Sequence, residues 1–520
     1  MQRTRRPDVR ATPLTAAVMV IIAATAQAAL ASPDGTAMTR PGAIELRNRL
    51  LAQMPAQHSA PTVPATTWPV ASCADSDDAS TLRGAVAAAG EGDTVDLSHL
   101  TCSAITLSHG AIPVLLNNLS ITGPGADALR IDGAGKDRVF VHPGYGALVL
   151  QGLTVHNGAA RASGFHITGG GCIVSGGYVV LDHSAVRDCY AAAEGVYGAG
   201  IFAYELLMFG STLSRNVGRA ANTSTGTATF GGGAYVNNMY LSNSTVSGNQ
   251  ATHDLNDGQS SYDTGGGIFS NTGGFVVAST ISGNYSYGFG GGIAAFGGYT
   301  GVINSTISGN IARTRSGGGL DLRLFQGGLL ANTTITANQA PAGGGAYLRG
   351  APSQFTLQST LMAGNSAGRP GADLGAAFAL TISGANNLVV AADAQVTLPN
   401  QTLHADPQLQ PLADNGGSTL THALSTGSPA LDAGNDLVGL DNDQRGAGFP
   451  RVIGAAPDIG AFEGFVVPHP APVNVPVASI GLLAGLGMLL AAFGAARLRP
   501  RRPPTAFTRL SPDRRHSSHR

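Results

Sequence analysis

Aromatic, acidic and imidazole side chains gather around two long insertions in the middle of the 520-residue chain, at 216–233 and 249–267. Aromatic faces beside hydrogen-bonding polar groups suit sugars, which makes these insertions candidates for ligand binding. The candidate residues are Phe230, His253, Asp254, Asp257, Tyr262, Asp263, Tyr285, Tyr287 and Phe289. The alternative is that the loops are solvated and their aromatic rings pack on the rest of the molecule. The segment "DLNDG" (254–258) misses the calcium-loop spacing by one residue, so we predict neither a metal site nor a cofactor.

Catalytic residues are not identifiable. A glycoside hydrolase needs two carboxylates about 5 to 9.5 Å apart, and a polysaccharide lyase needs a strong base together with cations. Acidic residues are sparse between 160 and 390, and the chain has a single lysine, Lys136. Asp321 in "GGGLDLRLF" shares a predicted strand face with Arg323, which predicts an ion pair on the outer surface. Catalysis therefore remains the alternative to binding.

Repeats identify the elements that must position these residues. "STISGN" occurs at 279–284 and again at 305–310, and looser copies lie at 211–216, 244–249, 333–338 and 360–365. A glycine triplet accompanies most copies, and no helical pattern lies between consecutive copies. Each repeat is therefore a β-segment followed by a Gly-Asn corner, a variable loop and a glycine corner. Repeats about 26 to 35 residues long without crossover helices predict an all-β fold, a right-handed parallel β-helix of roughly ten coils over 71–400.

Stacking of coils predicts two ladders, because equivalent positions of successive coils lie about 4.8 Å apart. The predicted inward aliphatic ladder is Leu213, Val246, Ile281, Ile307, Ile335 and Met362. The predicted amide ladder is Asn216, Asn249, Asn284, Asn310, Asn338 and Asn365, with a corner at each asparagine. In "VVASTIS" we expect Val277, Ser279 and Ile281 to share one strand face. Long insertions at one corner emerge on one face, so the two candidate loops should lie together.

Composition agrees with a turn-dense all-β protein. Glycine accounts for 73 residues, only 12% of residues are charged and the net charge is −1, which argues against a nucleic-acid partner. The four cysteines fall into two neighbouring pairs, from which we predict disulfides Cys73–Cys102 and Cys172–Cys189 in an exported chain. The alternative, a zinc site, lacks the C-x-x-C spacing.

Both termini have the composition of targeting segments. Residues 1–31 combine arginines, an apolar run and small-x-small sites, which predicts a secretory signal peptide rather than a permanent anchor. A mobile lead-in is expected over 32–70, with a short helix near 43–54. A Pro-rich spacer (466–476) precedes 20 uncharged residues, 477–496, which predict a transmembrane helix with a basic cytoplasmic tail at 497–520.

Several segments resemble known exported β-helix proteins. "STLRGAVAAAGEGDTVDLSHLTCSAITLSHGAI" (80–112), with the segments that follow up to 158, resembles the CSLREA-type and polymorphic-outer-membrane-protein-like group. The segments 406–434 and 441–463 resemble the choice-of-anchor Q domain, and the tail 474–502 is similar to PEP- or IPTL-type C-terminal anchors. The resemblance implies an envelope-anchored surface protein, but it implies no catalytic residues.

Residues 401–465 are expected to cap the open edge of the last coil, since such an edge would otherwise pair with other chains. Ion pairs and turn bonds within the cap are expected from Asp432, Asp441, Asp443, Arg445, Arg451, Asp458 and Glu463. A calcium site at Asp441 and Asp443 is the alternative.

The predicted function is an exported, cell-surface module for adhesion or interaction, held in the membrane by 477–496, with glycans or surface proteins as partners. The alternative function is a polysaccharide-degrading enzyme, a pectate lyase- or polygalacturonase-like β-helix.

Overall fold

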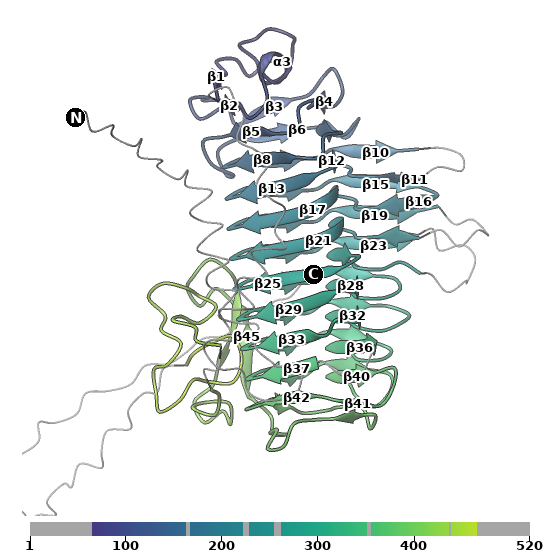
Figure 1. Ribbon diagram of the computed structural model, residues 1–520, viewed down its shortest axis with the longest axis vertical. Helices are drawn as coiled ribbons and strands as arrows, with labels where there is room; N and C mark the ends of the chain where they lie inside the picture. Colours follow the sequence, from purple (N-terminus) through teal and green to yellow (C-terminus); the bar gives the residue numbers. More distant parts are fainter. Residues whose placement is uncertain are drawn as a thin grey trace, which may run out of the picture. The chain divides into compact units, whose positions relative to one another are not determined.

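Parallel strands stack coil upon coil through the computed structural model, which describes residues 65–162, 167–221, 228–253, 262–350, 355–435 and 438–464 (Figure 1). All of these residues belong to one compact unit of the chain, Met1–Val466. Three long sheets of 20, 11 and 8 strands run along the stack. The 11-stranded sheet contains one strand from each coil, so the predicted parallel β-helix is confirmed, with about eleven coils.

The "STISGN" repeat builds the 11-stranded sheet. Its central strands are β18 (Thr212–Ser214), β22 (Thr245–Ser247), β26 (Thr280–Ser282), β30 (Thr306–Ser308), β34 (Thr334–Thr336) and β38 (Leu361–Ala363). Each strand pairs with the equivalent strand of the next coil, as in Val246↔Ile281↔Ile307. Every member of the predicted aliphatic ladder has 0% exposure, which confirms that this row faces the core.

The predicted amide ladder is also confirmed. Each asparagine side chain from Asn216 to Asn338 donates through Nδ2 to the Oδ1 of the next, at 2.8 Å from Asn216 to Asn249 and 2.9 Å from Asn249 to Asn284, and Asn365 donates to Asp373 Oδ1 at 2.8 Å. Each Oδ1 also accepts the backbone N–H of the preceding asparagine, so the ladder satisfies buried polar groups of two coils at once. Positive φ falls on the preceding residue, as at Gly283 with φ +61°, so the prediction of a corner at the asparagine itself is wrong by one residue.

A further corner interrupts the segment that the sequence suggested as one strand. Strand β25 (Gly273–Val277) ends before Ala278, which has φ +47°, and β26 begins at Thr280. The prediction that Val277, Ser279 and Ile281 share one face is therefore wrong. Ser279 instead turns its hydroxyl along the stack, where it accepts the N–H of Ser244 at 3.0 Å, while its own N–H donates to Ser305 Oγ at 3.1 Å. The repeated segment thus contains a hydroxyl ladder as well as an amide ladder.

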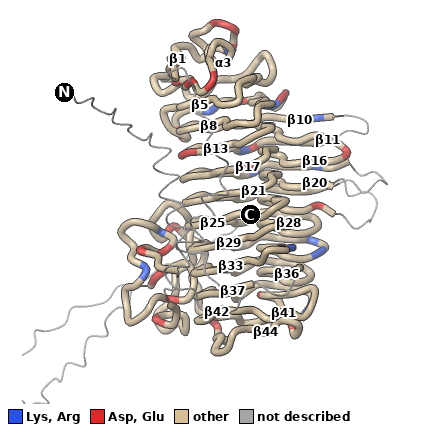
Figure 2. The backbone as a smooth tube through the Cα atoms, in the orientation of Figure 1, with Lys and Arg blue, Asp and Glu red and all other residues tan. Residues whose placement is uncertain are grey.

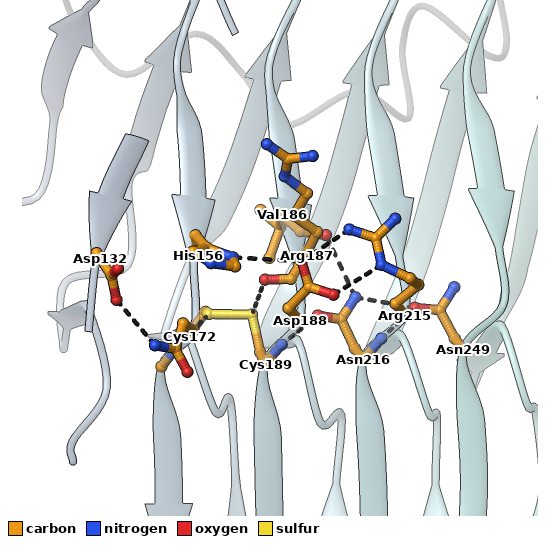
Figure 3. Close-up of a disulfide and its surroundings, with 12 residues drawn as sticks. Asp132, His156, Cys172, Val186, Arg187, Asp188, Cys189, Arg215, Asn216 and Asn249 are labelled. Carbon is orange, nitrogen blue, oxygen red and sulfur yellow. Dashed lines mark hydrogen bonds and ion pairs between the residues drawn. A yellow bond between two sulfur atoms is a disulfide. The ribbon is translucent and has the colours of Figure 1, made fainter. Parts of the chain in front are cut away.

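Both predicted disulfides are present. Cys73–Cys102 spans 29 residues and Cys172–Cys189 spans 17. Cys189 occupies the position of the ladder asparagine in its coil, and its backbone N–H donates to Asn216 Oδ1 at 3.0 Å (Figure 3). The second disulfide therefore continues the core column where the amide ladder begins.

The N-terminal end of the stack carries α3 (Leu82–Ala88), which the sequence reading did not predict as a helix. Thr81 is its N-cap, and its Oγ1 accepts the N–H of Gly84. Leu82 and Ala85 are fully buried, and Arg83 binds Asp75 at 2.7 Å, so the helix covers the first coils with a satisfied charge. A threonine before an apolar run was the available signal.

Residues 406–464, called here the flanking segment, pack along the side of the stack (Figure 1). The prediction that this segment caps the open edge of the last coil is wrong in its placement. It contacts several successive coils: Thr280 Oγ1 donates to Leu420 O, Thr306 Oγ1 to Gln444 Oε1, and Ser359 Oγ to Asn435 O. The flanking segment lies along the side of the stack because the outer face of the stack is apolar there, and the segment buries this face from solvent. Val438 and Leu440 of the segment contact an apolar cluster on that face, which comprises Phe275, Val277, Ala278, Ile303, Leu329 and Ala331.

The expected ion pairs within the flanking segment are largely present. Arg445 binds Asp443 at 2.6 Å, Arg451 lies 3.6 Å from Glu463, and all four side chains are buried. Two backbone N–H groups donate to Asp432, and the N–H of Asp432 itself donates to Asp458. Asp441 is exposed and Asp443 is occupied by Arg445, so these two do not form the alternative calcium site. No cluster of metal-ligating side chains occurs among the described residues.

Within the described ranges, no helix is both long and apolar enough to cross a bilayer. The predicted signal peptide, residues 32–64 of the lead-in with its short helix, the spacer, the transmembrane segment 477–496 and the basic tail lie outside the described residues. The last residues of the predicted lead-in, 65–70, are described, and there the prediction is wrong, because β1 (Thr67–Pro69) pairs in parallel with β2 (Thr94–Asp96) and so belongs to the stack.

Candidate functional site

An outward row of side chains on the large sheet changes character from coil to coil. The row runs through β12 (Ile173–Ser175), β17 (Ile201–Phe209), β21 (Ala234–Ser242), β24 (Ile268–Ser270), β28 (Ile293–Gly297), β32 (Leu320–Leu324) and β36 (Ala346–Gly350). In register it reads Val174, Phe202, Tyr235, Phe269, Ala294, Asp321 and Tyr347. Aromatic residues therefore occupy three consecutive coils, and a carboxylate follows two coils later.

A second line of aromatic residues runs beside this row. Tyr197 in β16 (Gly195–Tyr197) pairs in register with Phe230 in β20 (Thr229–Phe230), and bridges through Thr264 continue the line to Phe289. Tyr197 and Phe230 stack with their ring centroids 5.3 Å apart, and Phe230 meets Phe269 of the first row edge to face at 5.3 Å. Phe296 in β28 also meets Phe269 edge to face, with ring centroids 5.2 Å apart. The aromatic residues of the two lines and Phe296 form the aromatic surface, which comprises Tyr197, Phe202, Phe230, Tyr235, Phe269, Phe289 and Phe296.

The sequence reading found only Phe230 and Phe289 of this surface. The available signal was the aromatic residue that closes "GAGIF", "GGGAY" and "GGGIF", one residue after an inward apolar position. This alternation places the aromatic ring on the outer face of each strand. The inward neighbours Ile201, Ala234 and Ile268 have 0% exposure, which confirms the alternation.

Two arginines lie over the end of the aromatic surface (Figure 2 shows basic residues beside β28 and β36). Arg349 lies 4.5 Å from the ring centroid of Phe289 and 5.1 Å from that of Tyr347. Arg315 lies 5.6 Å from Phe289 and 5.5 Å from Tyr262, a candidate residue that is 56% exposed. Guanidinium groups held over aromatic faces are stabilised by the ring quadrupole and keep their outer N–H groups available.

Asp321 holds Arg349 in place. Its Oδ2 lies 3.0 Å from Arg349 Nη2 and accepts the hydroxyl of Ser316 at 2.6 Å. The prediction of a surface ion pair with Arg323 is wrong, because Asp321 has 0% exposure and its partner comes from the next coil. Burial raises the pKa of Asp321 to about 6, and the nearby charge of Arg349 counteracts that rise.

His253 and Asp263 form a buried pair. Their Nδ1 and Oδ2 atoms lie 2.7 Å apart, and the ring of Tyr287 meets the imidazole edge to face at 4.4 Å. Asp263 has 0% exposure and also accepts the N–H of Thr229 at 2.7 Å. In this arrangement the pair fixes the corner below the aromatic surface. Their contact with a ligand stays a prediction.

Of the remaining candidates, Tyr285 is half-buried on β27 (Tyr285–Ser286), beside Gln250 and Ile311 of the neighbouring coils. Burial raises the pKa of its phenol. Asp254 and Asp257 lie outside the described residues. The structure thus brings Tyr262 and Phe289 to the arginines, whereas Phe230 contacts Tyr197 and Phe269 and His253 pairs with Asp263.

The geometry suits binding more than hydrolysis. Asp321 and Asp263, the two carboxylates nearest to these aromatic rings among the candidates, both have 0% exposure, whereas the carboxylates of a hydrolase must contact the scissile bond. The rings of the aromatic surface are half-buried apart from the buried Phe269, and Tyr262 beside them is exposed. Such rings and two guanidinium groups can instead contact a ligand and bind anionic or hydroxyl groups. A cavity of about 30 Å³ is lined by Arg349 and mainly by apolar residues such as Leu322, Leu348 and Phe355, and has room for roughly one water molecule.

Comparison with known proteins gives a likeness of fold. No family model matches the chain, and no curated protein matches it. Among solved structures, the chain is similar to "Crystal structure of pectate lyase Pel9A", with 14% sequence identity and a TM-score of 0.38. The match covers 77% of this chain and 96% of that one. At this identity and TM-score the likeness carries no conclusion about the activity of this chain.

Proposed function

We propose that this chain is an exported, envelope-anchored surface protein whose β-helix binds an extended glycan across the aromatic surface. The observation that carries the proposal is the pair of aromatic lines on consecutive coils, which end at Arg315 and Arg349. Coils repeat every 4.8 Å or so, which gives a periodic array of ring faces for a periodic ligand. The resemblances at 406–463 and 474–502 support the location at the envelope.

The arginines favour an acidic glycan. The salt bridge with Asp321 uses Nη2 of Arg349, so the other N–H donors of the guanidinium group do not bind Asp321. The Arg349 side chain is 27% exposed. A guanidinium group pairs with carboxylate or sulfate groups through parallel N–H donors. A sugar ring on the neighbouring aromatic faces would place such a group within reach. We therefore favour uronic or sulfated polysaccharides over neutral ones.

The test is binding of the full chain, purified in mild detergent, to a panel of immobilised acidic and neutral polysaccharides. Arg315→Gln with Arg349→Gln should weaken binding to acidic members at least about tenfold, or ~1.4 kcal/mol. Tyr262→Ala should weaken binding to all bound members. Matched controls are Arg161→Gln, which removes another arginine held over a tyrosine, and Tyr145→Ala, which removes another exposed tyrosine. Equal loss in variants and controls would refute the assignment of the surface.

The same samples decide the enzymatic alternative. Incubation with each polysaccharide should release neither new reducing ends nor unsaturated products. Depolymerisation by the wild-type chain would replace the binding proposal with the enzymatic one. The anchoring part is tested separately, because deletion of 477–520 should release the protein from the membrane fraction after export.

A further inference from the structure

A cluster of three tyrosines and one carboxylate lies on β13 (Tyr178–Asp182), β17 and β21, apart from the residues of the aromatic surface. Register places Tyr178, Glu205 and Asn238 side by side on the three strands. The rings of Tyr178 and Tyr204 meet at 80°, with their centroids 6.3 Å apart. Tyr240 follows two residues after Asn238, and its hydroxyl accepts the Asn238 side-chain N–H at 3.1 Å.

Glu205 is the unusual member of this cluster. Glu205 is half-buried, yet its carboxylate has no hydrogen bond or ion pair with any described residue. Burial alone raises its pKa to about 7, because no basic group offsets the loss of water. A carboxylate that costs free energy to ionise and has no partner in the fold is suited to a partner that arrives from outside.

The surrounding groups define the chemistry of that partner. The titratable groups that face Glu205 from the packed strands are Tyr178, Tyr204 and Tyr240. The negative charge of Glu205 contributes to the raised phenol pKa of Tyr178 and Tyr240, which indicates that these phenols lie near it. Tyr204 is 51% exposed, so the cluster is open to solvent. Perpendicular ring faces beside a carboxylate attract an organic cation, through the ring quadrupoles and through direct charge pairing.

We propose that Tyr178, Tyr204, Glu205 and Tyr240 form a binding site for an organic ammonium group. The group supplies the positive charge that the carboxylate lacks, and its alkyl surface lies against the rings. A quaternary ammonium, as in choline, and a primary ammonium, as in a lysine side chain or an amino sugar, share this chemistry. The site is proposed from residues that take no part in the glycan proposal, so either can fail alone.

Because protonation of Glu205 competes with cation binding, the affinity of the site should depend on pH. Ionised Glu205 binds the cation and protonated Glu205 does not, so affinity should rise with pH through about 7. With a pKa of about 7, Glu205 is about 10% ionised at pH 6 and about 90% ionised at pH 8, so the affinity for a cation should increase roughly ninefold between these pH values. A neutral ligand of the same shape has no such dependence.

The experiment is calorimetric titration of the full chain with choline, N-acetyl-lysine amide and glucosamine, and with 3,3-dimethylbutanol as the neutral isostere of choline. At least one cation should bind, and choline and N-acetyl-lysine amide, which stay charged at pH 8, should bind more tightly at pH 8 than at pH 6. The order among the three at pH 7 identifies the source. Glu205→Gln should lower affinity at pH 8 at least about tenfold and remove the pH dependence. Glu194→Gln, a half-buried glutamate in an earlier coil, is the matched control and should bind as the wild type does.

Folding of the Glu205→Gln variant is checked by its melting curve, and the neutral amide should be tolerated because the ionised acid is itself costly in place. Tyr204→Ala, at the exposed ring, provides a second variant and should also weaken binding. The proposal is overturned if no cation binds at about 10 mM, if dimethylbutanol binds as well as choline, or if Glu205→Gln binds like the wild type.

Discussion

Truncation of one asparagine in the amide ladder should destabilise the stack far more than its size suggests. Asn284 has 1% exposure and makes four side-chain hydrogen bonds. Its Oδ1 accepts the backbone N–H of Asn249 at 3.0 Å and the Asn249 Nδ2 at 2.9 Å. Its Nδ2 donates to Asn310 Oδ1 and to Val246 O, both at 2.9 Å. Asn284→Ala removes all four bonds from the centre of the column.

The magnitude follows from the partners that are left behind. The backbone N–H and one Nδ2 hydrogen of Asn249 lose their acceptor inside the core, and each unsatisfied donor costs about 1–3 kcal/mol. Asn310 Oδ1 keeps the backbone N–H of Asn284 at 3.0 Å and is therefore not orphaned. The expected loss is about 2–6 kcal/mol. At about 4 kcal/mol, opening of this coil becomes roughly a thousandfold more frequent.

Hydrogen exchange resolved by peptide is the appropriate assay, because coils of a solenoid can open locally without global unfolding. Protection should fall in peptides that cover 244–310 and persist in coils near residues 119–156. Gln250→Ala is the control, since it removes a comparable amide from an exposed position of the preceding coil. If Asn284→Ala costs less than about 1 kcal/mol, or no more than Gln250→Ala, the ladder does not stabilise the fold as argued.

Three further perturbations test other parts of the structure. Cys172→Ser with Cys189→Ser should lower the free energy of unfolding by about 3 kcal/mol in urea titrations, and an unchanged midpoint would contradict the stabilising role of that disulfide. The pKa of Asp321 is raised to about 6 in the folded chain, so its contribution to stability is present below the ordinary value of 3.8 and is lost as pH rises through about 6. Asp321→Asn should flatten that part of the stability profile, and an unchanged slope would count against it. Deletion of 406–464 should expose the apolar outer face beside β25 and increase dye binding and aggregation, whereas a soluble product that binds no dye would show that the face needs no cover.

The fold could be predicted because its core positions repeat. Every coil places an aliphatic residue inward, and most coils place an asparagine at the same turn. The repeat length and the two ladders can therefore be predicted from the amino-acid sequence. The corner at Ala278 could not be predicted, since alanine has no preference for φ +47° and the neighbouring coils impose it. The placement of the flanking segment depended on contacts more than 100 residues apart, such as Thr280 with Leu420, which a linear pattern does not encode.

The candidate site was predicted only in part, for a related reason. Sequence reading brought Phe230, Tyr262 and Phe289 together through loop length, but it paired Asp321 with Arg323 on its own strand. The structure pairs it with Arg349 instead, one coil later and on the same side of the sheet. In a stack of coils the nearest neighbour of a side chain lies about 4.8 Å along the axis, closer than the next residue on its own face, which lies near 7 Å. Contacts between coils therefore dominate the surface chemistry.

This geometry separates the residues that specify the fold from those available for binding. The inward row Ile173, Ile201, Ala234, Ile268, Ile293, Leu320, Ala346 and Leu374 is apolar throughout and has 0% exposure. The adjacent outward row changes from Phe202 and Tyr235 to Ala294 and then to Asp321, although both rows are built by the same strands. Because one-residue alternation assigns the rows to opposite faces, an outward substitution leaves the core column intact. The positions at which successive coils differ most are thus those where a ligand can be selected without loss of the fold.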